Sequence, residues 1–423
     1  MSLSTIIASE IAEARAGNAT KLRDLDAFEE FFWLLEQSAP VFHAAIVEVT
    51  GATTVRQWKT ALNAIQDRYP LLSASIQKIP GQRPFFEKVR GASMDLRIAL
   101  LPDSLVLEEE MANEFQKTFG DGNGPLTWAT LFHAPDRSVV MFATHHSSLD
   151  EKSHLLLIQD LLAAVAGENL GRPLEVQPGL AQLVGLPDPA PYVKTLGGRS
   201  VAPEETTLST MSKIRVQRVR LSLMETQALQ ARARAEGTTV HGALVAAMTL
   251  AGKRYSDEWN AGPVRCQSTI DMRRTLGIPD VPGFLISAHK TPVLTPEGAS
   301  FWDIARSVKE DILPAQSIEA AHHLAGVVSS MVSAEREAQD LYSSILNGPL
   351  AYELLITNYA GYRVRLKYGD LRIENLFTAG PSSSPTVQKV SVLTVNGRLG
   401  MTLVARDMFP TLLEDVREIL AGV

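Results

Sequence analysis

Two adjacent histidines and a following aspartate join a strongly apolar strand to a strongly apolar helix. Residues 145–150 read His-His-Ser-Ser-Leu-Asp. The segment before them, 138–144, is rich in β-branched and aromatic residues, whereas 153–166 repeats its apolar residues at helical spacing. The pattern predicts a strand that runs into a helix through a histidine-bearing turn. Backbone on both sides can orient a histidine in such a turn toward a cleft, which suits a catalytic base.

The length and composition of the chain favour a protein with two folded domains. The chain has 423 residues, of which 45% are hydrophobic and 21% charged, so wholesale disorder is excluded. Its formal net charge of −7 argues against a nucleic acid or an anionic membrane as partner. The single cysteine, Cys266, excludes internal disulfides and thiolate-rich metal sites. Beside a β-type run, it reads as a small buried residue rather than a nucleophile.

No segment of the sequence reads as a targeting signal or a membrane span. Residues 1–26 mix charged and apolar side chains and lack the apolar core of a signal peptide. The longest stretch without Asp, Glu, Lys or Arg, 237–252, is shorter than the roughly 18 to 20 apolar residues that span a bilayer. We expect a cytoplasmic protein without a membrane span.

The first half of the chain alternates helices and strands and ends in a region of different composition. Segment 126–133 is expected to pair antiparallel with 138–144 through a turn at Pro135-Asp136. Proline, glycine, serine and threonine dominate between about 171 and 212. We therefore expect an N-terminal subdomain at 1–175, a linker at 176–212 and a C-terminal subdomain at 213–423.

The second half repeats the alternation of strands and helices. After a strand at 214–221, Ser222 and Glu225 stand at the spacing of a capping box. A nearly apolar helix at 239–254 is predicted to be buried. Near the end, Asn396-Gly397 lies between two apolar segments and predicts a type I′ hairpin, because both central residues of that turn need positive φ.

With these pieces in place, the chain resembles the HHxxxDG acyltransferase superfamily. That superfamily includes chloramphenicol acetyltransferase, the condensation domains of nonribosomal peptide synthetases and polyketide-associated alcohol acyltransferases. Five segments match its landmarks in order: 68–72 (Arg-Tyr-Pro-Leu-Leu), 145–150, 271–273 (Asp-Met-Arg), 357–361 (Thr-Asn-Tyr-Ala-Gly) and the Asn396-Gly397 hairpin with the helix after it. One position departs from the pattern, since Glu151 replaces the last glycine of the motif.

The resemblance implies both a fold and a division of labour among residues. The fold would be α/β, with two chloramphenicol-acetyltransferase-like subdomains, each a mixed sheet with helices, arranged as a V around a central active-site tunnel. His146 would be the general base, while His145, Asp150 and Arg273 would hold the active-site loop, with Arg273 ion-paired to Asp150. Candidates for contacts with an oxyanion or substrate are Ser382, Ser384 and Asn358, although the serines also fit a plain surface loop.

By the same resemblance, the chain would be a stand-alone acyltransferase. It would move an acyl group from a phosphopantetheine thioester, on coenzyme A or an acyl carrier protein, to a hydroxyl or amine of a small-molecule acceptor. Secondary-metabolite or complex-lipid biosynthesis would be the setting. The thioester is then a substrate, so no separate cofactor is expected.

Three other functions remain open. The chain could be a condensation-type enzyme that forms amides between two carrier-bound substrates, a non-catalytic relative that recruits a partner, or a metal-dependent enzyme. We expect no metal site, because adjacent histidines on a strand point apart and the other candidates, His154, His322 and His323, lie in predicted helices. No Gly-x-Ser-x-Gly, Walker loop or GxGxxG sequence occurs, which disfavours a serine hydrolase and nucleotide-driven chemistry.

Overall fold

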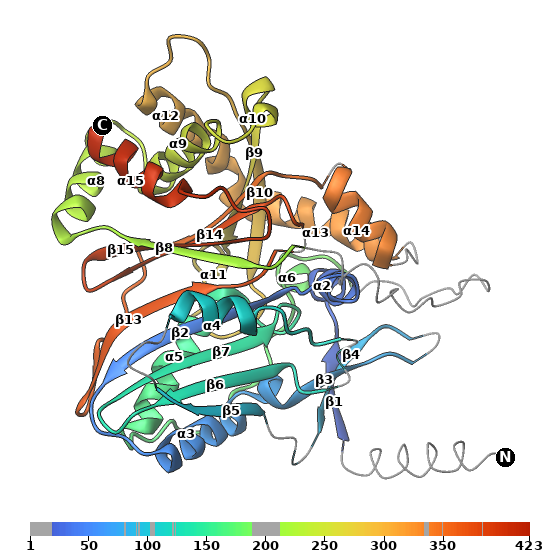
Figure 1. Cartoon of the computed structure of the whole chain (residues 1–423). Helices are drawn as coiled ribbons and strands as arrows, with labels where there is room; N and C mark the ends of the chain where they lie inside the picture. The colour runs from blue at the N-terminus through green and yellow to red at the C-terminus, as the bar shows by residue number, and fades with distance from the viewer. Residues whose placement is uncertain are drawn as a thin grey trace.

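Two six-stranded sheets and one small sheet form the framework of the protein. The computed structural model describes residues 19–79, 82–89, 91, 94–101, 106–120, 122, 124–187, 212–333, 338–348, 350–382 and 384–423. The small sheet is antiparallel and consists of β1 (Ala19–Asp24), β4 (Phe85–Val89) and β3 (Ala74–Gln77). Figure 1 shows the two large sheets one above the other.

The first large sheet carries the histidine turn. Its strand order is β12 (Lys367–Tyr368), β13 (Leu371–Ala379), β2 (Phe42–Thr50), β7 (Arg137–His145), β6 (Thr127–His133) and β5 (Asp95–Leu100). All neighbours pair antiparallel except β5 and β6. The alternation of side chains along β2 divides its two faces. Ala45, Val47 and Val49 pack with α3 (Val55–Arg68) and α5 (Glu151–Val165), whereas Ala44 and Ile46 pack with α4 (Leu107–Glu114).

The second large sheet is built from the C-terminal half. Its order is β10 (Ile286–Val293), β9 (Val264–Asp271), β11 (Leu354–Tyr359), β14 (Gln388–Val395), β15 (Arg398–Ala405) and β8 (Arg215–Arg220). Only β11 runs parallel to its neighbours. Its apolar face packs against α8 (Leu223–Ala235), α9 (Val240–Gly252), α10 (Asp257–Ala261), α12 (Phe301–Ile312) and α15 (Leu412–Gly422).

The chain crosses between the two large sheets late in the sequence. After β11 in the second sheet, β12 and β13 add to the first sheet, where β13 pairs with β2, and β14 then returns to the second sheet. The crossing follows the 357–361 segment. The first sheet therefore contains residues from both ends of the chain, and the subdomain limits at 175 and 213 remain a prediction.

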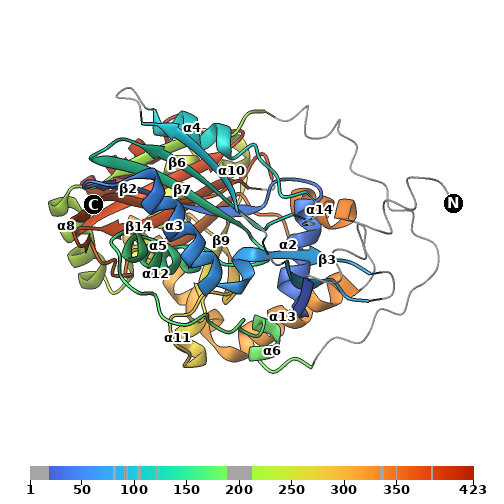
Figure 2. The ribbon, with the colours of Figure 1, turned by 90° about the horizontal axis from the view of Figure 1, so that it is seen from below.

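A group of helices lies beside the point where the sheets meet. α2 (Ala27–Glu36) contacts α6 (Leu180–Leu183), α13 (Ile318–Ser333) and α14 (Ala338–Asn347), and Figures 1 and 2 both place these helices together. α2 begins with a capping box of Asp26 and Glu29. Within the described ranges, no helix combines the length and apolarity needed to cross a membrane.

Several predicted elements are confirmed, and others differ. β6 and β7 pair antiparallel as expected, and the β14–β15 turn has φ of 52° at Asn396 and 72° at Gly397. The helix after the histidine turn begins at Glu151, earlier than predicted, because the Asp150 side chain caps it. α2 and β10 were not predicted, since α2 carries adjacent glutamates and β10 contains Pro292, which an edge strand tolerates. The expected linker contains α6, and its part at 188–211 lies outside the described residues.

Candidate active site

Hydrogen bonds fix the backbone of the histidine turn between β7 and α5. The His146 amide donates to the carbonyl of Val41 at 3.3 Å. His145 is fully buried, and its Nδ1 accepts a hydrogen bond from the Ser147 amide at 3.0 Å. The Ser148 side chain donates to the carbonyl of His145 at 2.8 Å. These contacts hold His145 at the end of β7 and attach the turn to it.

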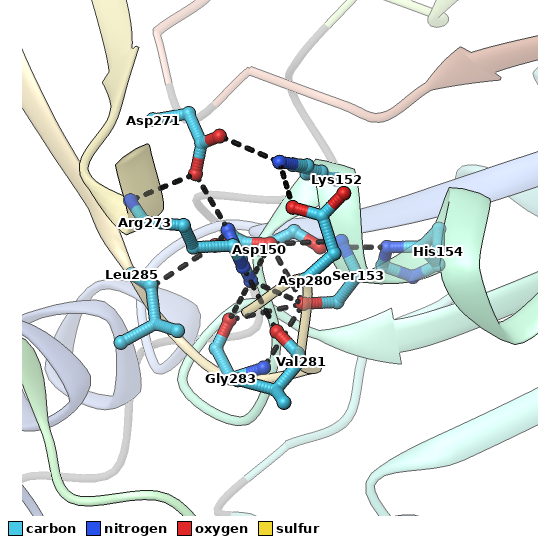
Figure 3. Close-up of polar contacts among 10 residues, drawn as sticks. All are labelled: Asp150, Lys152, Ser153, His154, Asp271, Arg273, Asp280, Val281, Gly283 and Leu285. Atoms are coloured by element: carbon cyan, nitrogen blue, oxygen red, sulfur yellow. Dashed lines mark hydrogen bonds and ion pairs between the residues drawn. The ribbon is translucent and has the colours of Figure 1, made fainter. Parts of the chain in front are cut away.

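Asp150 and Arg273 form a buried, two-pronged ion pair across the two halves of the chain (Figure 3). Arg273 Nη1 lies 2.9 Å from Asp150 Oδ2, and Nη2 lies 3.1 Å from Oδ1. The exposed fractions of the two residues are 0% for Asp150 and 1% for Arg273. Asp150 also accepts hydrogen bonds from the amides of Ser153 at 2.8 Å and Leu285 at 3.0 Å. The ion pair thereby ties the start of α5 to the end of β9 and to the chain before β10.

The remaining bonds of Arg273 occupy its guanidinium completely. Nε donates to the carbonyl of Val281 at 2.8 Å, Nη1 to Asp271 at 2.9 Å, and Nη2 to Ser153 at 3.1 Å. Next to this cluster, the Lys152 ammonium donates to both Asp271 and Asp280, as Figure 3 shows. A fully paired buried guanidinium makes a rigid joint, because every donor has a fixed acceptor.

The His146 ring lies among aromatic side chains. Its centroid is 4.0 Å from that of Phe32 on α2, in a stacked arrangement, and 5.4 Å from that of Phe284. Only 6% of His146 is exposed. An imidazole packed between aromatic faces keeps a defined orientation.

A cavity of about 250 Å³ has His146 in its lining and is bordered by α2, α13 and α14. Both large sheets and these helices contribute to it. Its apolar lining includes Phe28, Phe31, Phe32, Leu35, Phe284, Ile286, Leu324, Val327, Val328, Met331 and Leu355, and its polar lining includes His43, Gln267, Thr269, Ser287, Lys290, Thr357, Ser382 and Lys389. The cavity is thus consistent with a passage to His146 from one side, and its lining also contains two lysines and a second histidine.

Burial keeps both histidines of the motif neutral. It lowers the pKa of His145 to about 3, and it lowers the pKa of His146 well below its usual range. For His146, the nearby ammonium of Lys389 adds to the effect of burial on the pKa, and the backbone carbonyl of His146 itself opposes it. A neutral imidazole is the form that accepts a proton, so His146 is in the state that a general base requires.

Sequence reasoning missed a second imidazole at this site. His43 on β2 places Nε2 3.0 Å from Nε2 of His146, and its Nδ1 lies 3.4 Å from Oε2 of Glu151. The antiparallel register sets His43 opposite Thr144, the second residue before His146, although the two histidines are 103 positions apart. An isolated histidine in an otherwise apolar strand is the only signal in the sequence that marks it.

The three candidates for oxyanion or substrate contacts are not brought together. Ser382 lines the cavity. Ser384 is buried outside the cavity lining, and its hydroxyl lies 3.3 Å from that of Thr386. Asn358 also lies outside the lining and accepts a hydrogen bond from the Ala360 amide, whereas its neighbour Thr357 lines the cavity. Because side chains alternate along β11, the strand presents Thr357 to the cavity and Asn358 to the other face.

The other side chains considered in the sequence have ordinary structural settings. Cys266 is buried in β9, where burial raises the pKa of its thiol to about 12. His322 lies 2.9 Å from the carbonyl of Val184, a contact that joins α13 to the end of α6. In the part of the chain that the structure describes, no three or more His, Cys, Asp or Glu side chains are grouped as metal ligands would be.

Comparison with known proteins gives one family match and one curated relative. The family model for the phthiocerol/phthiodiolone dimycocerosyl transferase C-terminus matches residues 210–316. Nonribosomal peptide synthetase 8 of Aspergillus fumigatus is 26% identical over 152 residues, which is 35% of this chain. The match spans 2% of that much longer synthetase.

Solved structures match nearly the whole chain. Polyketide synthase associated protein 5 from Mycobacterium tuberculosis aligns over 96% of this chain and 98% of its own, with a TM-score of 0.64 and 17% identity. Trichothecene 15-O-acetyltransferase from Fusarium sporotrichioides aligns over 96% of both chains, with a TM-score of 0.68 and 12% identity. Similarity at these identities establishes a shared fold.

Proposed function

We propose that this chain, which has the two-subdomain fold of the condensation and chloramphenicol-acetyltransferase-like proteins, is an acyltransferase that uses His146 as its general base. It would move an acyl group from a phosphopantetheine thioester, on coenzyme A or an acyl carrier protein, to a hydroxyl or amine. Secondary-metabolite or complex-lipid biosynthesis is the setting that we propose. The observation that carries the proposal is a neutral, aromatic-clamped imidazole at the inner end of a mainly apolar cavity.

The proposed reaction needs one proton transfer in each direction. As the acceptor oxygen or nitrogen attacks the thioester carbonyl, the imidazole of His146 takes its proton. The new bond to the acyl carbon forms, the carbon–sulfur bond breaks, and the thiolate receives the proton. The enclosed site keeps water from competing with the acceptor for the thioester.

The cavity lining favours an apolar group on one substrate. Phenylalanines from α2 and aliphatic side chains from α13 form one wall, and Ile286 and Leu355 belong to the opposite sheet. Burial of such a group contributes roughly 25 cal/mol per Å² of apolar surface. We therefore propose that this cavity holds the hydrocarbon part of an acyl chain or of a lipid-like acceptor, and that a second passage admits the other substrate.

A donor and acceptor screen tests the function. Purified protein would be offered acyl-coenzyme A and acyl-carrier donors of increasing chain length, with hydroxyl and amine acceptors, and products would be identified by mass spectrometry. We expect product formation with at least one apolar donor or acceptor. His146→Ala should lower turnover at least about 100-fold.

The matched control is His323→Ala, an exposed histidine on α13 outside the cavity lining. It should retain the activity of the unmodified protein. Equal activity in the His146 and His323 variants would refute the assignment of the base. If no donor is consumed and neither coenzyme A nor carrier protein binds, a non-catalytic recruitment role becomes the better account.

A further inference from the structure

A buried carboxylate, a second imidazole and His146 stand in a row at the base of the cavity. His43 occupies the middle position, with Nε2 3.0 Å from Nε2 of His146 and Nδ1 3.4 Å from Oε2 of Glu151. The two imidazole rings are nearly perpendicular, at 89°, with centroids 4.3 Å apart. All three residues are buried, with exposed fractions of 4% for His43, 6% for His146 and 1% for Glu151. One nitrogen of the His43 ring thus contacts His146, and the other lies near a carboxylate oxygen without making a hydrogen bond to it.

The fold explains why His43 reaches both neighbours. On β2, His43 shares a face with Ala45 and Val47, and this face packs against α5. Glu151 is the first residue of α5, while His146 is the first residue of the turn that follows the paired strand β7. The strand register and the start of one helix therefore place His43 between the other two side chains.

Burial raises the pKa of the Glu151 carboxyl, whereas its other surroundings favour a negative charge. The N-terminus of a helix stabilises a carboxylate through its unpaired amides and its dipole. Around the carboxyl of Glu151, the ammonium of Lys389 and the hydroxyls of Thr378, Ser391 and Thr357 also favour the ionised form. Burial acts in the opposite direction and raises its pKa. This is the position at which the HHxxxDG motif has glycine, so the carboxylate is a feature of this chain that the motif does not require.

We propose that His43 and Glu151 form a proton relay with His146, in which His43 shares the proton taken from the acceptor and Glu151 stabilises the resulting positive charge. The relay rests on the proposed acyl transfer. His146 alone is poorly placed to hold an imidazolium charge, because its ring is buried and the ammonium of Lys389 lies near it. His43 is better placed, because a carboxylate faces its second nitrogen.

The relay returns the same proton that it takes up. The acceptor loses its proton to the His146–His43 pair as the bond to the acyl carbon forms. The carbon–sulfur bond then breaks, and the pair returns the same proton to the thiolate. His43 and Glu151 act through His146, so they are positioning residues, and the 3.4 Å separation between His43 and Glu151 should shorten when the pair becomes charged.

Several other charged or titratable groups lie around the three residues of the relay. Burial, and after it the ammonium of Lys389 on β14, lowers the pKa of both His43 and His146 well below the usual range, and burial lowers the pKa of Lys389 itself to about 8. His154 on α5 bonds to Thr144 and to the carbonyl of Asp150, and His145 lies in the turn. Asp150 is paired with Arg273. Glu151 is therefore the carboxylate that faces His43 among these groups.

The test replaces the carboxylate without changing its shape. Glu151→Gln should lower kcat roughly 10- to 100-fold with little change in KM, because substrate does not contact Glu151. Loss of the negative charge should also lower the pKa of the imidazole pair, so the acid limb of the kcat–pH profile should move to lower pH. Glu151→Asp should recover part of the activity, and His43→Gln should resemble Glu151→Gln.

The matched control is Glu319→Gln, which makes the same substitution at an exposed position in the first turn of α13. It should leave kcat and the pH profile unchanged. If Glu151→Gln and His43→Gln both keep the kcat and pH profile of the unmodified protein while His146→Ala is inactive, the relay is overturned and the acyltransferase proposal stands.

A second measurement does not depend on activity. In ¹⁵N-histidine NMR spectra of the full chain, the His43 and His146 signals should titrate as a coupled pair, and Glu151→Gln should shift both. Independent titrations that Glu151→Gln leaves unchanged would overturn the relay even if no substrate is found. Thermal melts of each variant establish that the spectra report on folded protein.

Discussion

The Asp150–Arg273 cluster and the His43–His146 pair belong to the same buried turn, but their polar groups are used very differently. Arg273 donates to two carboxylates, a hydroxyl and two carbonyls. Among the described residues, the His146 ring has one side-chain hydrogen-bonding neighbour, His43, and is otherwise enclosed by aromatic rings. A network in which every donor has an acceptor resists rearrangement. The imidazole pair makes fewer hydrogen bonds, so it can still accept a proton. The first cluster should therefore govern stability and the second should govern turnover.

The largest expected effect is on the saturated cluster. Arg273→Ala removes the partner of a fully buried carboxylate, which typically costs about 3 to 5 kcal/mol. The free energy of unfolding from denaturant titration, measured beside that of Arg274→Ala on the same short helix α11 (Arg273–Leu276), would give the difference. A change below 1 kcal/mol would mean that the ion pair does not hold the turn.

Replacement of His146 should lower turnover rather than stability, which is the reverse of the effect expected for Arg273→Ala. His146→Ala is expected to lose at least about 100-fold in turnover, equivalent to about 2.7 kcal/mol of transition-state stabilisation, while the protein stays folded. Steady-state kinetics and a thermal melt on the same sample separate the two effects. If the free energy of unfolding falls in His146→Ala as far as it does in Arg273→Ala, the two clusters do not have separate roles in stability and turnover.

A double-mutant cycle sharpens the role of Asp150. Asp150→Asn and Arg273→Ala should each lower the free energy of unfolding, and the double variant should be less destabilised than the sum, with a coupling of about 0.5 to 3 kcal/mol. Strict additivity, or unchanged stability with lost activity, would instead indicate that Asp150 orients a catalytic group.

The smallest expected effect is a pH dependence of stability. The pKa of His145 is depressed to about 3, so it is neutral when folded and gains a proton more easily when unfolded. Its contribution to stability is complete above about pH 6.5 and is lost as the pH falls toward 3, by about 1.4 kcal/mol per pH unit. Unfolding titrations at pH 7, 6 and 5 should show a shallower decline for His145→Gln. An identical decline would assign the acid sensitivity to the other buried histidines whose pKa burial lowers, namely His43, His146 and His154.

Parts of the site could be predicted because they depend on local spacing. The strand, turn and helix around His146 follow from apolar periodicity, and the motif resemblance linked Asp150 to Arg273, which the structure places in contact. His43 could not be found in this way, because its place depends on the register between β2 and β7. The packing of Phe32 over His146 depends on α2, which local patterns did not reveal.

The fold shows the same division between local and distant signals. The Asn396-Gly397 hairpin is specified by two residues with positive φ. The pairing of β13 with β2 joins segments more than 300 positions apart, and no local pattern identifies such a partner. Periodicity predicts that a strand exists, but the choice of its neighbour depends on how the whole apolar surface is covered.

The late crossing of the chain has a consequence for how the protein is made. β2 leaves the ribosome early, yet one of its two edges stays unpaired until residues 371–379 have been synthesised. An unpaired edge of an apolar strand is a site for pairing with other chains, and distant pairings form slowly. A nascent chain that stalls before β13 would therefore expose this edge. Chaperone demand and yield should depend more on how quickly the last quarter of the chain is translated than on how quickly the first sheet begins to form.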